Sequence, residues 1–170
     1  LTSSGANRRY VTIDKIPENL QHAFVAIEDS RFYQHNGIDI QGIIRAGMVG
    51  IMNGGHFTEG ASTITQQLIK NNVFPDFVNE TKYEKVERKL QEQYLALQIE
   101  KMLDKNSILE SYMNTINLGQ NTLGVQAAAN RYFRKDVSEL TLSECATIAG
   151  ITQSPGRYNP ITNPEENAKR

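Results

Sequence analysis

The stretch A-F-V-A-I-E-D-S-R-F-Y-Q-H-N-G, residues 23–37, decides how the rest of the chain is interpreted. Its apolar residues recur at roughly helical spacing, which predicts a helix over residues 18–34 with one buried face. Two adjacent acids, Glu28 and Asp29, stand where this apolar pattern stops, and Gly37 offers a left-handed end. A carboxylate at the edge of an apolar wall is one way to tune a general acid or base, whereas a lone Glu-Asp pair is more often a solvated part of a helix.

The composition limits the class of protein. The 170 residues are 39% hydrophobic, which is enough for one compact domain, and the formal net charge of −1 gives no electrostatic reason to expect nucleic-acid binding. The single cysteine, Cys145, lies in a helical apolar pattern and is expected to be a buried structural thiol. The three histidines lack metal-ligand spacing, so a structural zinc site is not expected. No apolar run is long enough for a transmembrane helix, and both ends of the chain look like cuts through a longer protein.

The pattern along the chain predicts a mainly α fold. The expected helices cover residues 18–34, 40–52, 62–71, 81–103, 107–114, 125–133 and 141–150. Asp39 is the expected N-cap of the second of these, and Thr141 begins a capping box for the last. A short extended segment is expected at Tyr10–Ile13, with no strand-period segment of useful length after it. Residues 53–61 are rich in Gly and Asn and are expected to be mobile.

The longest predicted helix, residues 81–103, has two contrasting faces. One face is an apolar stripe that is expected to be buried, and it consists of Val86, Leu90, Leu97 and Ile99. The other face carries charges at four-residue steps that can pair along the surface, namely Glu84, Arg88 and Glu92. For Arg88 and Glu92 the simpler interpretation is a salt bridge of a few tenths of a kcal/mol. The functional alternative is an arginine that holds a phosphate and a second acid that works with Glu28, because two separated carboxylates are typical of chemistry at an anomeric carbon.

Two neighbouring segments are candidates for a binding role. The segment S-T-I-T-Q-Q-L-I-K-N, residues 62–71, places polar side chains at helical spacing with only one charge among them. These side chains are Ser62, Thr63, Gln66, Gln67 and Lys70. A solvated face is the more common explanation, but hydroxyls and amides suit a sugar or a phosphate better. The preceding G-H-F-T-E-G-A-S has the glycine spacing of a phosphate-binding loop, but Ala61 stands in the place of its lysine, so a nucleotide site is not expected.

Taken in order, these segments resemble the peptidoglycan glycosyltransferases, glycosyltransferase family 51, found in class A penicillin-binding proteins and monofunctional transglycosylases. The resemblance covers about Asn7 to Pro164. It is carried by E-D-S-R-F-Y-Q-H-N-G, G-A-S-T-I-T-Q-Q-L-I-K-N, R-K-L-Q-E-Q-Y-L-A-L-Q-I-E, I-L-E-S-Y-M-N-T-I-N-L-G, the Ala-rich helix and S-P-G-R-Y-N-P. It implies one glycosyltransferase domain over residues 1–170, with a lysozyme-like fold of a large globular lobe and a smaller membrane-facing lobe. In the family this domain normally follows a membrane anchor.

The resemblance also implies an activity and a set of site residues. The activity is an inverting transfer of a growing lipid-diphosphate-linked glycan to the GlcNAc 4-hydroxyl of Lipid II, in bacterial cell wall synthesis. By motif position Glu28 matches the catalytic base and Glu92 the second essential glutamate, while Lys70 and Arg88 match the cations that hold the diphosphate. Polar cleft residues of the family are matched by Ser62, Thr63, Gln67 and Asn71. Residues that shape the first motif are matched by Asp29, Phe32 and His35; from the residues alone, His35 is more simply a hydrogen-bonding structural residue.

The same resemblance implies ligands and a location. A divalent cation, Mg²⁺ or Mn²⁺, is expected, with Glu92 as the candidate nearest to it, and no organic cofactor is expected. Moenomycin is the expected inhibitor, and the outer face of the bacterial cytoplasmic membrane is the expected location. The loop at residues 53–61 matches the mobile segment beside the donor cleft. Apolar residues that are candidates for membrane contact are Phe57, Val73, Phe74 and Phe77.

Two rival functions are open on the sequence alone. A lysozyme-like muramidase cleaves the same glycan with water on a similar fold, so the fold does not decide between them. The pair of Lys70 and Arg88 favours a diphosphate-linked donor, which a hydrolase does not use. A non-catalytic glycan- or partner-binding module would not need both Glu28 and Glu92. The sequence does not tell whether the parent protein also carries a transpeptidase domain.

Overall fold

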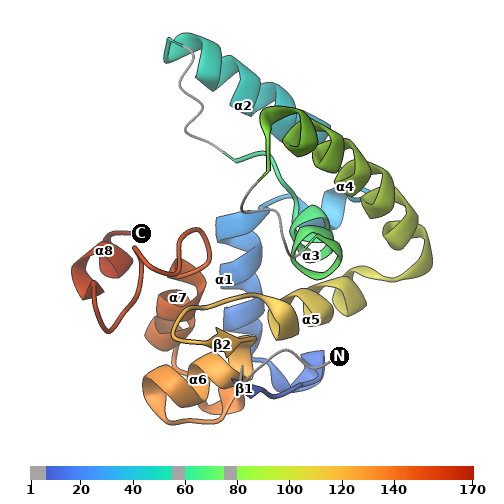
Figure 1. Ribbon diagram of the computed structural model, residues 1–170. Coiled ribbons are helices and arrows are strands. Elements are labelled where there is room, and N and C mark those ends of the chain that lie inside the picture. Colours follow the sequence, from blue (N-terminus) through green and yellow to red (C-terminus); the bar gives the residue numbers. More distant parts are fainter. Residues whose placement is uncertain (1–6, 55–59, 75–79) are drawn as a thin grey trace. The chain divides into compact units, whose positions relative to one another are not determined.

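The structure, a computed structural model, describes residues 7–54, 60–74 and 80–170 (Figure 1). These residues are mainly helical, which confirms the predicted fold class. The chain divides into two compact units, each of which is described by itself. Unit 1 comprises Leu1–Ser30 with Asn106–Arg170, and unit 2 comprises Arg31–Lys105. A large globular lobe and a smaller membrane-facing lobe stay a prediction.

Unit 1 is built around the packing of α1 (Glu18–Glu28) along α7 (Leu142–Gly150), which Figure 1 shows side by side. The buried Phe24 of α1 meets Tyr112 of α5 (Lys105–Thr115) edge to face, with 6.1 Å between ring centroids. The other elements assigned to this unit are β1 (Asn7–Arg8), η1 (Ile13–Lys15), β2 (Thr122–Leu123), α6 (Val125–Phe133), η4 (Val137–Glu139) and α8 (Pro164–Lys169). The thiol of Cys145 is buried here as predicted, and burial, helped by the charge of Glu144, raises its pKa.

The small sheet of unit 1 consists of two strands of two residues each, too short to show a period in the sequence. Strand β1 pairs in parallel with β2. The expected extended segment Tyr10–Ile13 is not part of it. The backbone there is held instead by a side chain of α5: the Val11 N–H donates to Asn114 Oδ1 at 2.8 Å, and Asn114 Nδ2 donates to the Val11 carbonyl at 2.8 Å. An asparagine thus replaces a neighbouring strand, which no local pattern indicates.

Helix α1 ends at Glu28, six residues earlier than predicted. Asp29 leaves the helical region, with φ −158° and ψ 72°, and a short turn η2 (Phe32–Gln34) follows. In a continuous helix Phe24, Glu28 and Phe32 would lie at four-residue steps on one buried face. The break allows both aromatic rings to be fully buried while Glu28 stays half-buried. The predicted extent of this helix, to residue 34, is therefore wrong, and the two acids stand at its actual end.

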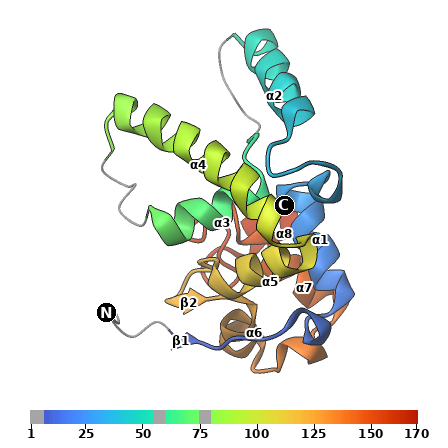
Figure 2. The same cartoon turned by 90° about the vertical axis from the view of Figure 1, so that its right-hand side faces the viewer.

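Unit 2 consists of η2 and three longer helices, α2 (Ile40–Met52), α3 (Ile64–Val73) and α4 (Lys82–Met102). Helix α3 packs along α4, as Figures 1 and 2 both show. Thr63 and Thr81 begin α3 and α4 with reciprocal capping boxes, which fix where each helix starts.

The N-cap of α2 is Asp39, as predicted. Its carboxylate accepts a hydrogen bond from the Gly42 N–H at 2.9 Å and forms an ion pair with Arg31 at 2.6 Å. Burial alone would raise the pKa of Asp39, but the hydrogen bonds from Arg31 and Gly42 and the charge of Arg31 lower it overall.

Helix α4 buries two of its three predicted surface charges, contrary to the prediction, whereas Glu84 is exposed as predicted. The buried residues are Arg88, Glu92 and Ala96, at four-residue steps. Of the predicted buried stripe, Val86 is 61% exposed and Leu90 is 62% exposed. The periodicity did not tell which side of the helix packs, because Arg88 and Glu92 neutralise each other in the folded chain.

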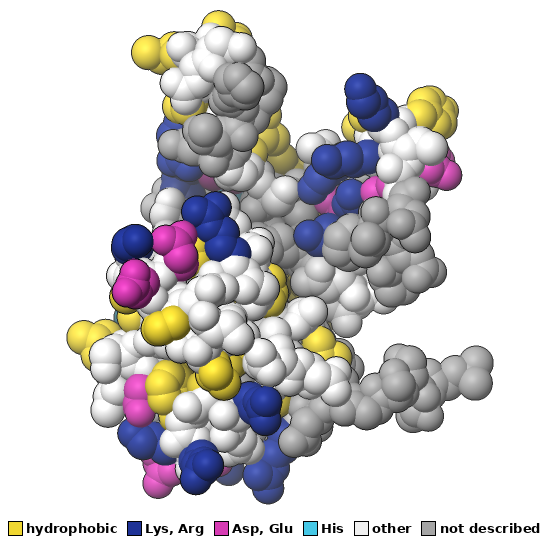
Figure 3. Space-filling view, turned by 60° about the vertical axis from the view of Figure 1, so that its left-hand side comes forward, with side chains coloured by type: hydrophobic (Ala, Val, Ile, Leu, Met, Phe, Trp, Pro, Cys, Tyr) yellow, Lys and Arg dark blue, Asp and Glu magenta, His cyan; other side chains and the backbone are white. Residues whose placement is uncertain are grey.

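Unit 2 is poor in buried apolar side chains. Among the described residues, six of the buried hydrophobic side chains belong to it, whereas it holds fifteen of the eighteen large hydrophobic side chains that are exposed. On the face drawn in Figure 3, hydrophobic side chains reach the surface at several places, and Lys and Arg are interleaved with Asp and Glu. No helix in the described part of the chain is long and apolar enough to cross a membrane.

Candidate functional site

Three segments of unit 2 meet at Gly37. Its carbonyl accepts a hydrogen bond from the Thr63 hydroxyl at 2.7 Å, so the turn after η2 is fixed to the start of α3. Gly37 has φ +90°, and a Cβ there would lie 2.8 Å from the Ala96 carbonyl oxygen of α4. Only glycine allows this approach without strain. The contact holds the first motif against α4, one helical turn from Glu92.

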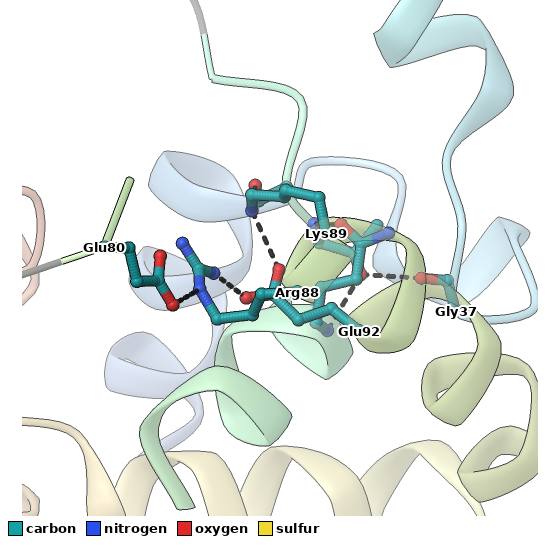
Figure 4. Close-up of polar contacts among 8 residues, drawn as sticks. Gly37, Glu80, Arg88, Lys89 and Glu92 are labelled. Atoms are coloured by element: carbon teal, nitrogen blue, oxygen red, sulfur yellow. Dashed lines mark hydrogen bonds and ion pairs between the residues drawn. The ribbon is translucent and has the colours of Figure 1, made fainter. Parts of the chain in front are cut away.

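Four paired charges, Glu80 just before α4 and Arg88, Lys89 and Glu92 on α4, form what we call the charge cluster (Figure 4). Arg88 Nε donates to Glu80 at 2.6 Å, and Arg88 Nη1 donates to Glu92 Oε1. Lys89 Nζ donates to Glu92 Oε2 at 2.8 Å and to the Ser62 hydroxyl at 3.0 Å. The structure therefore brings together three of the predicted site residues, Ser62, Arg88 and Glu92, through Lys89.

Burial distinguishes this arrangement from a surface salt bridge. The side chains of Arg88 and Glu92 are 7% and 1% exposed. The hydrogen bond to Glu80, opposed by burial and reinforced by Glu92, raises the pKa of the Arg88 guanidinium above its ordinary value. A buried ion pair of this kind stabilises little relative to apolar packing, yet removal of one partner is costly. Charges in such a place indicate a role beyond stability.

Other predicted residues lie on α3. Gln67, Lys70 and Asn71 are half-buried, and their spacing of three and four residues places them on one face of the helix with Thr63. The cap residue Thr63 is itself 1% exposed. One side of α3 thus presents amide and ammonium groups, whereas the Thr63 hydroxyl is buried and donates to the Gly37 carbonyl.

The first motif continues in unit 2 with Phe32 and His35. Phe32 is fully buried, and Lys105 Nζ lies 4.4 Å from its ring centroid. Lys105 also donates to the His35 carbonyl at 2.7 Å, while His35 Nδ1 accepts a hydrogen bond from the Gly37 N–H at 3.1 Å. Phe32 and His35 therefore fix the backbone of this turn.

In unit 1, Glu28 lies at the C-terminal end of α1 with its side chain 10% exposed. The Thr152 hydroxyl donates to Glu28 Oε1, and Arg170 Nη2 lies 3.4 Å from the same oxygen. The single hydrogen of that hydroxyl serves either Glu28 or the Ala149 carbonyl 3.0 Å away. Burial raises the pKa of the neighbouring Tyr112 phenol well above its ordinary value, and the charges of Glu28 and Asp29 raise it further. An ionised tyrosine is thereby excluded at neutral pH.

Sequence reasoning missed two residues of the charge cluster, Glu80 and Lys89. It also missed the two side chains that contact Glu28, which are Thr152 and Arg170. Lys89 stands three residues before Glu92, so the helical spacing of R-K-L-Q-E contained its signal. Thr152 and Arg170 are 124 and 142 residues from Glu28 along the chain, so only the fold brings them to it. Residues 55–59 and 75–79 lie outside the described residues, and with them the predicted membrane contacts Phe57 and Phe77 and most of the loop at 53–61.

Comparison with known proteins identifies the family. A sequence model of the transglycosylase family matches residues 1–170. Penicillin-binding protein 1A of Clostridium perfringens strain 13 is 50% identical over 168 residues, which are 96% of this chain and 24% of that protein. Penicillin-binding protein 1A of Aquifex aeolicus is 46% identical over 163 residues (96% of this chain, 22% of that protein), and that of Escherichia coli K12 is 48% identical over 158 residues (92% and 18%).

The chain spans about a fifth to a quarter of the length of these relatives. The match of the family model, in contrast, extends over every residue of the chain. The chain therefore belongs to the transglycosylase family, in agreement with the resemblance seen in its motifs.

Proposed function

We propose that the chain is a peptidoglycan glycosyltransferase domain that polymerises Lipid II into glycan strands. The family match over all 170 residues carries the proposal. The charge cluster supports it, because it holds two cations, buried Arg88 and Lys89 beside the Ser62 hydroxyl, and such groups suit a sugar diphosphate. A muramidase has no need for cations, because no diphosphate leaves in its reaction. A module that only binds glycan has no need for both Glu28 and Glu92.

In the proposed reaction Glu28 is the base. It takes the proton of the GlcNAc 4-hydroxyl of Lipid II while that oxygen attacks the anomeric carbon of the growing chain. The bond between this carbon and the diphosphate oxygen breaks with inversion, and the lipid diphosphate leaves with the electron pair. The diphosphate is already a good leaving group, so one base and a set of cations are sufficient, whereas a hydrolase needs an acid and a base.

The remaining residues bind and position. We assign the diphosphate to Lys70 and Arg88, whose charges offset the negative charge that grows on the departing oxygen. Glu92 positions the cations, since its two oxygens accept from Arg88 and Lys89. The glycan is assigned to the polar side chains Ser62, Thr63, Gln67 and Asn71. The shape of the first motif is assigned to Asp29, Phe32 and His35.

The described residues do not fit a site for Mg²⁺ or Mn²⁺ built by the protein. Among them, no group of three His, Cys, Asp or Glu side chains is placed to hold a metal ion. Glu92, the candidate from the sequence, is already bonded to Arg88 and Lys89 through both of its oxygens. No step of the proposed reaction is therefore assigned to a metal ion, and the requirement for a divalent cation stays a prediction.

We also propose contact with a membrane surface on the outer side of the cytoplasmic membrane, where Lipid II is used. Exposed apolar side chains of unit 2 support this proposal, since a water-facing set of this size is unusual in a soluble domain. They lie on α2, which carries Ile40, Ile43, Ile44, Met48, Ile51 and Met52, and on α4, which carries Val86, Leu90, Tyr94 and Leu97. Val73, named from the sequence, is 54% exposed, and Phe74 lines a pocket of about 360 Å³ with Leu90 and Tyr94. Inhibition by moenomycin belongs to the same proposal.

The deciding experiment is polymerisation of labelled Lipid II in detergent. Wild type is compared with Glu28→Gln and with Glu18→Gln, a control that changes an exposed glutamate at the other end of α1. We expect long glycan from wild type and Glu18→Gln and none from Glu28→Gln. Shortened glycan released from preformed strands would indicate a muramidase. Polymer from Glu28→Gln would show that the base is wrongly assigned.

A further inference from the structure

Within the described part of the chain, Arg88 forms ion pairs with Glu80 and Glu92, and the two carboxylates differ in exposure. Figure 4 draws its guanidinium with a carboxylate on either side. Glu92 is 1% exposed and is bonded to two cations, Arg88 and Lys89. Glu80 is 17% exposed, lies outside α4 just before its N-cap, and is bonded to Arg88 Nε at 2.6 Å. Glu92 is thus the more deeply buried partner of Arg88, and Glu80 is the partner that is in contact with solvent.

The charges of the cluster cancel. Arg88 and Lys89 contribute two positive charges, and Glu80 and Glu92 contribute two negative ones. In this state the cluster carries no net formal charge that would attract an anion. If Glu80 moves away, one positive charge is left over, and it is located on a guanidinium edge that suits an oxyanion.

We propose that Glu80 occupies the place on Arg88 that an oxygen of the donor diphosphate takes, so that the donor binds by displacing this carboxylate. The proposal rests on the proposed function, which assigns the diphosphate to Arg88. Glu80 is then a specificity-determining residue. A ligand with a single negative charge would replace one carboxylate by another anion of the same charge, so its binding free energy would gain little. A diphosphate brings additional charge and displaces Glu80 with a net gain.

A structural role for Glu80 would have the opposite effect. If Glu80 only held the chain against α4, its removal would leave binding unchanged or weaker, since the site would lose order. Competition predicts tighter binding after its removal. The sign of the change therefore separates the two roles.

The test is binding of inorganic pyrophosphate to the full chain by isothermal titration calorimetry at low ionic strength. We compare wild type with Glu80→Gln, Glu87→Gln and Arg88→Gln. Glu87 precedes Arg88 in α4 and is exposed, so Glu87→Gln makes the same change in net charge away from the guanidinium. Because a negative charge in contact with Arg88 is removed, Glu80→Gln should bind pyrophosphate about fivefold more tightly than wild type. For Glu87→Gln the gain in affinity should be less than about twofold.

The outcomes separate the inference from the proposed function. Weaker binding in Arg88→Gln, with equal affinities in wild type and Glu80→Gln, would overturn the role of Glu80 and leave the diphosphate assignment intact. Unchanged binding in Arg88→Gln would remove the diphosphate assignment itself. Equal gains in Glu80→Gln and Glu87→Gln would show a general charge effect and would also overturn the inference.

A measurement on wild type covers the case in which Glu80→Gln does not fold. In protein with ¹⁵N-labelled arginine, the Nε–H signal of Arg88 reports its partner at Nε. Titration with pyrophosphate should shift this signal, and inorganic phosphate at the same concentration should shift it far less. A signal that stays in place while pyrophosphate binds elsewhere would contradict displacement of Glu80.

Discussion

Arg88 and Glu92 are almost excluded from water, and each is matched by the other. Such a pair stabilises a fold about as well as apolar side chains of the same size, but either charge alone is very unfavourable in that position. The energetics of the two residues are therefore coupled. This coupling allows their contribution to stability to be separated from their contribution to activity.

We expect Glu92→Leu to lower the free energy of unfolding by about 3 kcal/mol, because Arg88 loses its most buried partner. The double variant Arg88→Met with Glu92→Leu should recover most of this loss while polymerisation stays absent. Urea denaturation of both single variants and the double variant gives the coupling energy. Additive losses would show that the two residues do not depend on each other.

Thr152 lies beside the proposed base. Thr152→Val keeps the shape of the side chain but removes the hydroxyl that donates to Glu28. Because the hydroxyl holds the Glu28 carboxylate in position, the rate of Lipid II polymerisation should fall about tenfold, with KM nearly unchanged. Thr152→Ser should restore the rate. A change in KM alone would place Thr152 in substrate binding instead.

At the level of helices, the sequence predicted those helix starts that depend on a side chain close by in the chain. Asp39 and Thr141 mark helix starts because a side-chain oxygen satisfies an N–H group in the first turn, and both cap helices in the structure. The end of α1 and the buried face of α4 depend on partners distant in the sequence. Four-residue spacing identified Arg88 and Glu92 as a pair, but that the pair is buried could not be read from it.

The N-cap of α2 gives a pH-dependent prediction. The pKa of Asp39 is lowered in the folded state, so its contribution to stability is complete above the unfolded pKa of about 3.9 and is lost as the pH falls through the folded value. Asp39→Ala should lower the free energy of unfolding by about 1 kcal/mol at pH 7. Urea titrations at pH 7 and at successively lower pH should show the difference from wild type shrinking. A difference that grows with acid would contradict this assignment.

For the whole molecule, the contrast between the two units predicts unequal local stability. Unit 1 holds most of the buried apolar side chains, and unit 2 holds most of the exposed ones. Hydrogen exchange should therefore be faster in α2 and α4 than in α1 and α7. Under the proposed membrane contact, vesicles of anionic and zwitterionic lipid should slow exchange in α2 and α4 and leave α1 and α7 unchanged. Equal protection of both units in water would contradict the difference in packing.

The order of the chain through unit 1 has a consequence for biosynthesis. Helix α1 finds its partner α7 only after more than a hundred further residues, whereas unit 2 is one continuous segment. At about 5–20 residues per second, the synthesis of α7 follows that of α1 after an interval on the order of ten seconds. Unit 2 emerges complete during this interval and can fold first. A nascent chain halted before α7 should therefore expose the apolar side of α1 to chaperones, and its release should end that exposure.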